Sequence, residues 1–357
     1  MTKKALIGMS GGVDSTVSAY LMLQKGFSCI GATMQLHDRK DKNSTCGSSD
    51  DIDDARAVAQ RMGIPHYVFD FQKDFEDQVI ADFVQSYENG LTPNPCIRCN
   101  KHLKFHCLLN QAKEMDCDYI VSGHYARIRR DEETGRFLLY KAADRAKDQT
   151  YFLACLSQDQ LSHIQFPLGD LTKEEVRSIA EQNGFINARK RDSQDICFIP
   201  DGDYVSFMKK WTGKTYPEGN YLDLSGNILG THKGAVCYTI GQRKGLGIAL
   251  GAPAYVCSKD MQANTVTLGP NEALFSRGLV ADHWNWFPFP VLEKPLHVTA
   301  KTRHSQHEQS AVVYPGENGT ATVLFDNPQR AVTPGQAVVL YDGDLVVGGG
   351  TIREAIR

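Results

Sequence analysis

Short apolar runs alternate with amphipathic stretches along the first two hundred residues. Residues 5–7 form a continuous apolar run, residues 16–24 have apolar positions at helical spacing, and residues 29–34 are again strand-like. Strand, helix and strand at this spacing predict a parallel sheet with right-handed crossovers. We therefore expect an α/β domain whose ligands lie beyond the carboxyl ends of its strands.

The same alternation continues to about residue 200. Further strands are predicted over 66–69 and 119–121, with a hairpin over 127–141. Helices are predicted over 50–61, 75–89, 101–115 and 172–183. The last helix has a Thr172/Glu175 capping box and Gly184 as its stop.

Beyond residue 201 the pattern changes to short alternating strands broken by glycine and proline. One short helix is predicted over 203–211. Strands are predicted over 296–302, 309–314, 320–325 and 337–340, with a hairpin turn at Asp342-Gly343. This tail is typical of a small β-barrel. We expect three domains: a catalytic domain over 1–202, a β-rich linking domain over 203–277 and a C-terminal β-barrel over 278–357.

The strongest candidate chemistry lies in the loop Gly8-Met-Ser-Gly-Gly-Val-Asp-Ser15, between the first strand and the first helix. Free backbone N–H groups in a helix's first turn bind anions, and glycines let a ligand approach the backbone. Asp14 could hold a metal ion beside bound phosphates, and Met34 either borders this pocket or fills the core. The structural alternative is a plain glycine turn with Ser15 as the helix cap.

A second candidate centre is the Cys96-x-x-Cys99 pair in the proline-rich loop over 91–100. With Asn100 as the cap of the next helix, Cys99 lies at a helix N-terminus, where the dipole and flanking basic residues lower the pKa of its thiol. A redox pair and half of a zinc site are alternatives, but the sequence has no second Cys-x-x-Cys to complete a zinc site. Cys197 lies in an apolar, strand-like run, where an inert thiol is the default.

Composition mainly excludes classes of protein. The 357-residue chain is 41% hydrophobic and 23% charged, and its formal net charge of −3 argues against indiscriminate nucleic-acid binding but not against local basic patches. We expect no membrane span and no secretory leader. Ten cysteines without such a leader favour a reducing, cytoplasmic location.

The glycine loop resembles that of the N-type ATP pyrophosphatases. Together with Cys99 and the β-rich tail, it makes the whole chain similar to the tRNA-specific 2-thiouridylases of the MnmA family. The motifs that carry the resemblance lie at 8–15, 92–100, 122–125, 147–150, 192–198 and 238–243. The resemblance implies a Rossmann-like parallel-sheet domain of the adenine-nucleotide α-hydrolase type, followed by the two β-rich domains.

The resemblance also implies a reaction. The family adenylates C2 of the wobble uridine, position 34, in the tRNAs for Lys, Glu and Gln. Sulfur from a cysteine persulfide then gives 2-thiouridine, AMP and pyrophosphate. By resemblance Cys197 carries the persulfide and Cys99 resolves it as a Cys99–Cys197 disulfide, which a reductant must reopen. The implied cofactors are ATP and Mg²⁺, and the implied donor is a cysteine desulfurase or a sulfur-relay protein.

Binding residues carry over position by position. Those that match ATP contacts are Gly8, Met9, Ser10, Gly11, Gly12, Val13, Asp14, Ser15, Met34 and Gly123. Those that match the segment holding the target base are Asn94, Pro95 and Cys96. Those that match tRNA contacts are His124, Lys147, Asp148, Gln149, Arg303, His304 and Gln336. Further candidate phosphate contacts, for most of which ordinary surface charge is the favoured role, are Arg127, Arg129, Arg130, Arg189, Lys190 and Arg191.

One departure from the family pattern keeps alternatives open. Some members carry Asp at the position of Cys96, as a candidate acid/base, so that role is in doubt here. Cys96, Cys99 and Cys197 could instead hold an iron–sulfur cluster. A different ATP-pyrophosphatase-type tRNA-modifying or amide-forming ligase would not need the cysteines, and a non-enzymatic nucleotide-binding module would release no AMP.

Overall fold

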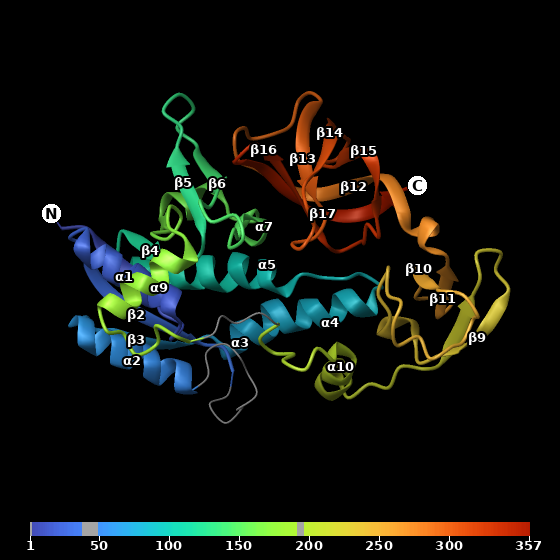
Figure 1. The fold of residues 1–357 in the computed structure, drawn as a ribbon, viewed down its shortest axis with the longest axis horizontal. Coiled ribbons are helices and arrows are strands. Elements are labelled where there is room, and N and C mark those ends of the chain that lie inside the picture. The colour runs from blue at the N-terminus through green and yellow to red at the C-terminus, as the bar shows by residue number, and fades with distance from the viewer. Residues whose placement is uncertain (1, 38–48, 191–195) are drawn as a thin grey trace.

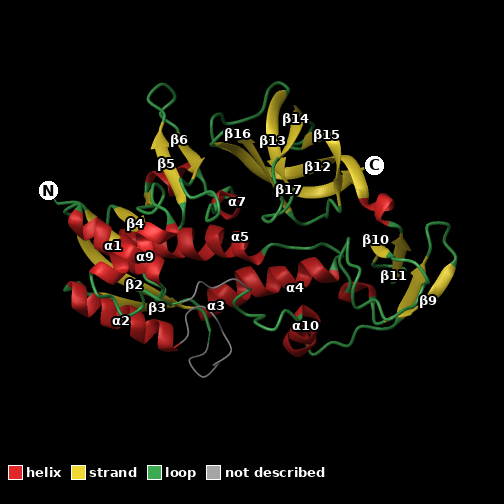
Figure 2. Ribbon diagram, in the orientation of Figure 1, coloured by secondary structure: helices red, strands yellow, loops and turns green. Residues whose placement is uncertain are grey.

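The computed structural model of the chain describes residues 2–37, 49–190 and 196–357. Three sheets organise these residues, and they follow one another along the chain except for one hairpin near residue 130 that joins the third sheet (Figure 1). Helices gather around the first sheet, whereas the two later sheets are joined mainly by loops (Figure 2). None of the described helices is long and apolar enough to cross a membrane.

The first sheet is parallel and has the strand order β3-β2-β1-β4-β7. Its strands are β1 (Lys4–Gly8), β2 (Ser28–Gln35), β3 (His66–Asp70), β4 (Tyr119–Val121) and β7 (Ile164–Gln165). The central strand is buried on both faces, because Ala5 and Ile7 belong to one hydrophobic cluster and Leu6 to another. This confirms the predicted parallel sheet.

Helices cover both faces of this sheet. They are α1 (Val13–Gln24), α2 (Ser49–Met62), α5 (Pro95–Cys99), the π-helical η2 (Asn100–Cys107), α6 (Leu108–Glu114) and α9 (Lys173–Gln182). Helices α1 and α2 pack on the face of Ala5 and Ile7, whereas the continuous run α5–η2–α6 covers the face of Leu6. Helix α9 lies beside α1 (Figure 1).

A second long helix packs against α5. It consists of α3 (Gln72–Phe75), the π-helical η1 (Glu76–Ile80) and α4 (Ala81–Glu88). Both long helices therefore contain a π-helical segment, in which hydrogen bonds run from residue i+5 to residue i. The apolar spacing predicted the two helices but not these segments, because the apolar positions on either side of a widened turn still recur at helical spacing.

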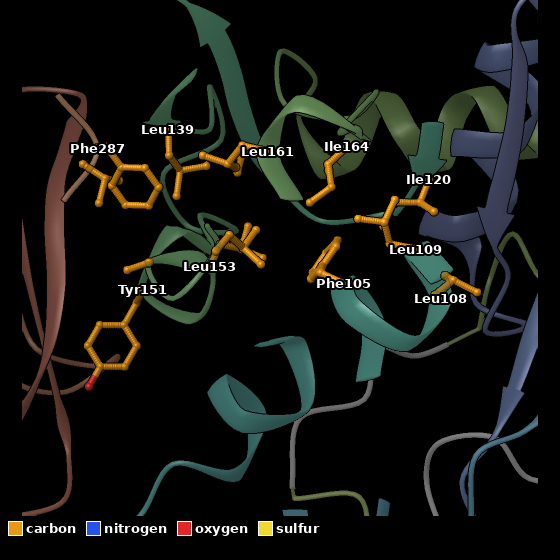
Figure 3. Packing of buried hydrophobic residues seen from close by; sticks show 14 of the residues in the cluster. Phe105, Leu108, Leu109, Ile120, Leu139, Tyr151, Leu153, Leu161, Ile164 and Phe287 are labelled. Carbon is orange, nitrogen blue, oxygen red and sulfur yellow. The ribbon is translucent and has the colours of Figure 1, made fainter. Parts of the chain in front are cut away.

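One buried cluster joins the first sheet to the rest of the molecule. Figure 3 shows its side chains extending from Ile120 of β4, past Phe105 of η2, to Leu153 of α7 (Thr150–Leu153) and Phe287 of the C-terminal domain. The sheet, the long helix and the barrel thus share a core, so their relative positions are fixed by close packing.

The middle of the chain has a four-stranded sheet of order β10-β11-β8-β9. Its elements are α10 (Tyr204–Thr212), β8 (Gly219–Leu222), β9 (Ile228–His232), η3 (Ala235–Cys237), β10 (Tyr255–Asp260), β11 (Thr265–Gly269) and η4 (Asn271–Leu274). The short helix predicted over 203–211 is confirmed, with Asp203 as its N-cap.

The C-terminal strands close into an antiparallel barrel through pairing of the first strand with the last. They are β12 (Phe275–Trp286), β13 (Leu296–Lys301), β14 (Gln309–Pro315), β15 (Ala321–Arg330), β16 (Ala337–Asp342) and β17 (Leu345–Ile356). The predicted barrel is therefore confirmed. The predicted hairpin, β5 (Ala126–Arg130) and β6 (Phe137–Lys141), joins this sheet where Tyr140 pairs with Leu345.

Candidate functional site

The candidate nucleotide site lies where β1 ends. Gly12 is the N-cap of α1, so Ser15 is the third helical residue and not the cap that the plain-turn alternative assumed. The Ser15 Oγ accepts a hydrogen bond from the Ser10 N–H at 3.2 Å and donates one to the Gly12 carbonyl at 3.0 Å. Gly11 has a φ of +71°, and a Cβ there would lie 2.5 Å from the Asp51 carbonyl oxygen. The turn therefore requires glycine.

The end of β4 closes against the same helix start. A Cβ on Gly123 would lie 2.8 Å from the backbone nitrogen of Ser15, so glycine permits this close approach. Met34, near the end of β2, is half-buried and packs against two of the hydrophobic clusters. The structure thus brings Gly123 to the glycine loop, and it gives Met34 a packing role at the carboxyl edge of the sheet.

Asp14 is engaged by two side chains that the sequence did not reveal. The Lys173 Nζ donates to both carboxylate oxygens of Asp14, at 2.7 and 2.8 Å, and the Tyr125 hydroxyl donates to one of them at 2.9 Å. Lys173 is the first residue of α9, and its side chain is only 10% exposed. A cation at Asp14 is therefore already provided by the chain, and a metal ion bound there would have to displace Lys173.

The chain after α9 also forms hydrogen bonds with the glycine loop. The Asn187 Nδ2 donates to the Gly11 carbonyl at 3.0 Å and to the Thr16 hydroxyl at 2.7 Å. Lys190 pairs with Asp51 and Asp54 of α2. Lys190 thus has an ion-pairing role within the fold, whereas Arg191 lies outside the described residues.

Cys99 does not lie at a helix N-terminus, which corrects the expectation from sequence. The helix begins at Pro95, and its N-cap is Asn94, whose side chain accepts from the Ile97 N–H at 3.3 Å. Asn100 is buried inside the helix and donates from its Nδ2 to the Phe152 carbonyl at 3.1 Å. Cys96 is nearer to the helix start than Cys99. Because dipole effects fade within the first turn, the helix dipole acts more on Cys96 than on Cys99.

Cys197 lies in a tight turn and not in a strand. The Ile199 N–H donates to the Ile196 carbonyl at 2.9 Å, which makes Cys197 and Phe198 the corner residues of that turn. The Phe198 ring packs edge-on against Phe83, 5.3 Å away between centroids. Residues 192–195 of the motif at 192–198 lie outside the described residues.

The two candidate cysteines are associated with the same hydrophobic cluster. Cys99 is 8% exposed and belongs to the core of this cluster, and Cys197 is partly buried and packs against it. Met34 and Phe69, from the carboxyl ends of β2 and β3, pack against the same cluster. Both cysteines therefore lie toward the carboxyl edge of the sheet, on which the glycine loop also opens.

The residues present do not fit an iron–sulfur or zinc centre. Within 2–37, 49–190 and 196–357, no three His, Cys, Asp or Glu side chains converge into a metal-binding group. Cys96 is exposed, whereas Cys99 is buried. Three thiolate ligands would have to face one metal or cluster, and this arrangement lacks that geometry.

Several predicted tRNA contacts have bonds within the fold. His124 is buried, its Nδ1 lies 2.6 Å from the Ser122 Oγ, and burial lowers the pKa of its imidazole well below the ordinary range. The Gln149 Oε1 accepts from the Tyr125 N–H at 2.9 Å, and Asp148 accepts from the Thr150 hydroxyl at 2.6 Å. The segment that contains Lys147 is therefore held in a fixed shape by its own side chains.

The predicted tRNA contacts on the barrel also have partners within the fold. Arg303 donates to the carbonyls of Arg330 and Ala331, and the His304 ring lies 4.5 Å from that of Phe152. The Gln336 Nε2 donates to the Thr92 carbonyl at 2.9 Å and the Pro93 carbonyl at 3.3 Å. Gln336 thus ties the barrel to the loop that ends at Asn94, the cap of the helix with Pro95 and Cys96.

Comparison with known families covers nearly all of the chain. Residues 3–201 match the family described as tRNA methyl transferase HUP domain. Residues 205–270 match the tRNA methyl transferase PRC-barrel domain, and residues 276–352 match the aminomethyltransferase beta-barrel domain.

Two curated relatives are similar over their whole length. The tRNA-specific 2-thiouridylase MnmA of Acetivibrio thermocellus is 50% identical, over 98% of this chain and 99% of the relative. The protein of the same name from Clostridioides difficile is 48% identical, over 100% of this chain and 99% of the relative.

Proposed function

Because the chain belongs to the family of the tRNA-specific 2-thiouridylases MnmA, we propose that it is a tRNA-uridine 2-sulfurtransferase. Its substrates are ATP and the tRNAs for Lys, Glu and Gln, and its product is 2-thiouridine at the wobble position, with AMP and pyrophosphate. The observation that carries this proposal is the common cluster of Cys99 and Cys197 at the carboxyl edge of the sheet. A sulfur-transfer enzyme needs two such thiols near its nucleotide, whereas an amide-forming ligase does not.

The first step activates the C2 oxygen of the uridine. That oxygen attacks the α-phosphate of ATP, an O-adenylate forms, and pyrophosphate leaves. The residues proposed to hold ATP are Gly8, Met9, Ser10, Gly11, Gly12, Val13, Asp14, Ser15, Met34 and Gly123. Support comes from the N–H groups at the start of α1 and from the Lys173 ammonium, which places positive charge beside the loop. When bound with ATP, Mg²⁺ supplies further neutralisation of phosphate charge, and phosphate oxygens and water are the main ligands that it prefers.

The second step replaces oxygen with sulfur. The terminal sulfur of a persulfide on Cys197 attacks C2, and AMP departs with the original oxygen. The Cys99 thiolate then attacks the Cys197 sulfur, so that a Cys99–Cys197 disulfide forms and the bond to the transferred sulfur breaks. The released electron pair completes the thiocarbonyl. A thiol reductant afterwards returns two electrons to the disulfide.

Binding of the tRNA is proposed at the contacts that match the family. The target base lies against Asn94, Pro95 and Cys96, and the contacts to the rest of the tRNA are His124, Lys147, Asp148, Gln149, Arg303, His304 and Gln336. A uridine in an anticodon loop must leave its stack to reach such a pocket. The bonds from Gln336 to the Thr92 and Pro93 carbonyls support this arrangement, because they hold one wall of the pocket against the barrel.

A cysteine desulfurase, directly or through a relay protein, supplies the persulfide in a reducing cytoplasm, in keeping with ten cysteines in the chain. The chain divides into a catalytic domain over 1–202, a linking domain over 203–277 and a barrel over 278–357. The matched family ranges 3–201, 205–270 and 276–352 support these boundaries.

Nucleoside mass spectrometry tests the proposed function. The tRNA for Glu is incubated with the protein, ATP and a cysteine desulfurase charged with L-cysteine. We expect 2-thiouridine at position 34, and none without ATP or with Cys197→Ser. Full activity of the Cys99→Ser/Cys197→Ser variant on an amine substrate would favour the amide-forming ligase, and ATP binding without AMP release would favour a binding module.

A further inference from the structure

Cys99 directly precedes a π-helical segment, and the carbonyls of that segment receive side-chain donors. Helix α5 ends at Cys99 and η2 begins at Asn100. The Gln160 Nε2 donates to the Phe105 carbonyl at 2.9 Å and to the Lys101 carbonyl at 3.1 Å. The Cys107 Sγ lies 3.2 Å from the His102 carbonyl. A widened turn disturbs the ladder of an α-helix, and these donors satisfy carbonyls within the widened segment.

Gln160 is suited to this task because its side-chain amide is buried and held at both ends. It is only 9% exposed. It lies in α8 (Gln158–Ser162), where its Oε1 accepts from the Ser157 N–H at 2.9 Å as part of a capping box. With the oxygen fixed in this way, both amide hydrogens point at η2. Removing the amide would leave the buried Phe105 carbonyl and the partly buried Lys101 carbonyl without these donors, which is costly.

The π-helical segment controls where Cys99 points. A π-turn adds one residue to an α-helix, and each residue turns an α-helix by about 100°. The part of the helix beyond the segment is anchored by Leu108, Leu109 and Ala112 in the core under the sheet. If the widened turn became an ordinary α-helical turn, Cys99 would rotate about the helix axis by about 100° relative to that anchor. Its present orientation places it in the cluster against which Cys197 packs.

Two neighbouring contacts join the helix around Cys99 to the segment that contains α7 and α8. The Asn100 Nδ2 donates to the Phe152 carbonyl at 3.1 Å, and the Cys155 Sγ lies 3.6 Å from the Ile97 carbonyl. Both partners lie in or just after α7, which leads into α8. The segment α7–α8 therefore contacts the helix on each side of Cys99. Gln160 makes the two hydrogen bonds to η2.

We propose that Gln160 is a positioning residue, whose amide stabilises the π-helical form of η2 and so turns the Cys99 thiol toward Cys197. This inference rests on the proposed function, in which these two sulfurs must bond. It assigns Gln160 no contact with tRNA or ATP. Its loss should therefore slow bonding between the two sulfurs while leaving the adenylation of tRNA intact.

The test compares Gln160→Met with Gln158→Met. Gln158 lies in the same helix, but its amide bonds the backbone of Phe137 on β6 and not η2. Each variant is oxidised with diamide in the absence of tRNA and ATP, and the Cys99–Cys197 disulfide is followed by non-reducing peptide mass spectrometry. We expect Gln160→Met to form it about tenfold more slowly than the native protein, and Gln158→Met to form it at close to the native rate.

A second readout separates positioning from general damage. Pyrophosphate release with tRNA and ATP should be unchanged in Gln160→Met, whereas thiolation should fall with the disulfide rate. If Gln160→Met does not fold, Gln160→Asn, whose amide is too short to reach η2, replaces it with the same expectations. A native protein that forms no such disulfide, or a folded Gln160 variant that forms it at the native rate, overturns the inference. Because the oxidation needs neither tRNA nor ATP, its result stands apart from that of the thiolation assay.

Discussion

At the residue scale, Lys173 determines the charge of the nucleotide loop. Its ammonium holds both oxygens of Asp14 in a largely buried pair. In Lys173→Met, Asp14 would face the ATP phosphates without that cation. A hydrogen bond between charged groups contributes about 1.5–3 kcal/mol, so we expect the KM for ATP to rise by about tenfold or more. Pyrophosphate release measured against ATP concentration gives the value.

The control for this prediction is Lys209→Met, which removes an exposed lysine from α10. Its KM for ATP should match that of the native protein. An unchanged KM in Lys173→Met would show that the Asp14–Lys173 pair serves the fold alone.

His102 makes the fold sensitive to acid. Burial, reinforced by the nearby cations of Arg98 and Lys101, lowers the pKa of His102 to about 4 from 6.5. Between these values the unfolded chain binds a proton that the folded chain does not. The stability that the fold gains from keeping His102 neutral is therefore complete above pH 6.5 and is lost as the pH falls toward 4. The urea midpoint should fall less steeply over this range in His102→Gln than in the native protein.

His297→Gln, at an exposed position of β13, is the matched control for the acid series. It should keep the native dependence of the urea midpoint on pH. Equal slopes for His102→Gln and the native protein would contradict the assignment.

The candidate site was predictable at the residue scale only where the chemistry is local. The loop from Gly8 to Ser15 is one continuous motif, so its strand–turn–helix context could be inferred directly. Lys173 and Gln160 act across contacts between elements that are far apart in the chain, and no local pattern marks them. A lysine directly after the capping residue Thr172 was visible, but nothing in the sequence paired it with Asp14.

At the element scale, most strands were predicted well, and helix starts with their caps less well. The strand over 119–121 and the capping box at Thr172 were confirmed without change. The helix carrying Cys99 was expected to start after Asn100, yet it starts at Pro95, because proline is favoured in the first turn and Asn94 supplies the cap. The run around Cys197 is apolar because it packs into a cluster as a turn, and apolar character alone cannot separate that from a strand.

The capping box of α9 gives a prediction for a single element. The Thr172 hydroxyl accepts from the Glu175 N–H at 3.2 Å, and the Thr172 N–H donates to the Glu175 carboxylate at 2.7 Å. Thr172→Val keeps the shape of the side chain but removes the acceptor, which should cost about 1 kcal/mol of unfolding free energy. Urea denaturation measures the loss, and Thr172→Ser, which retains the acceptor, should lose much less. Equal losses in the two variants would mean that the methyl group, and not the cap, stabilises the helix start.

At the scale of the whole molecule, the barrel holds one wall of the candidate tRNA pocket. The Gln336 amide reaches the carbonyls of Thr92 and Pro93, and the Thr92 N–H donates to the Pro334 carbonyl at 2.9 Å. Gln336→Leu would free this wall, so we expect thiolation at low tRNA concentration to fall by about tenfold. ATP binding without tRNA should be unaffected, and titration with a fluorescent ATP analogue checks it.

Gln329→Leu is a control on the same barrel, since that side chain bonds Gln306 and Asn327 and not the loop. Equal losses in the two variants would indicate general weakening of the barrel.

The order of the sheets along the chain was predictable, but their contacts were not. Alternating strands and turns identified the barrel, and strand–helix–strand spacing identified the parallel sheet. The pairing of Tyr140 with Leu345 joins two strands that are far apart in the chain, and no local pattern encodes such a partner. The common cluster of Cys99 and Cys197 likewise depends on packing between distant parts of the chain, and their proximity was expected only from the resemblance to a family.

Single-turnover sulfur transfer shows whether Cys99 releases the transferred sulfur from Cys197. Protein loaded with persulfide at Cys197 is mixed with ATP and tRNA without reductant, quenched in acid, and digested for non-reducing peptide mass spectrometry. We expect one peptide pair linked through Cys99 and Cys197 for each 2-thiouridine formed. Complete thiolation while the two peptides stay unlinked would contradict this role of Cys99.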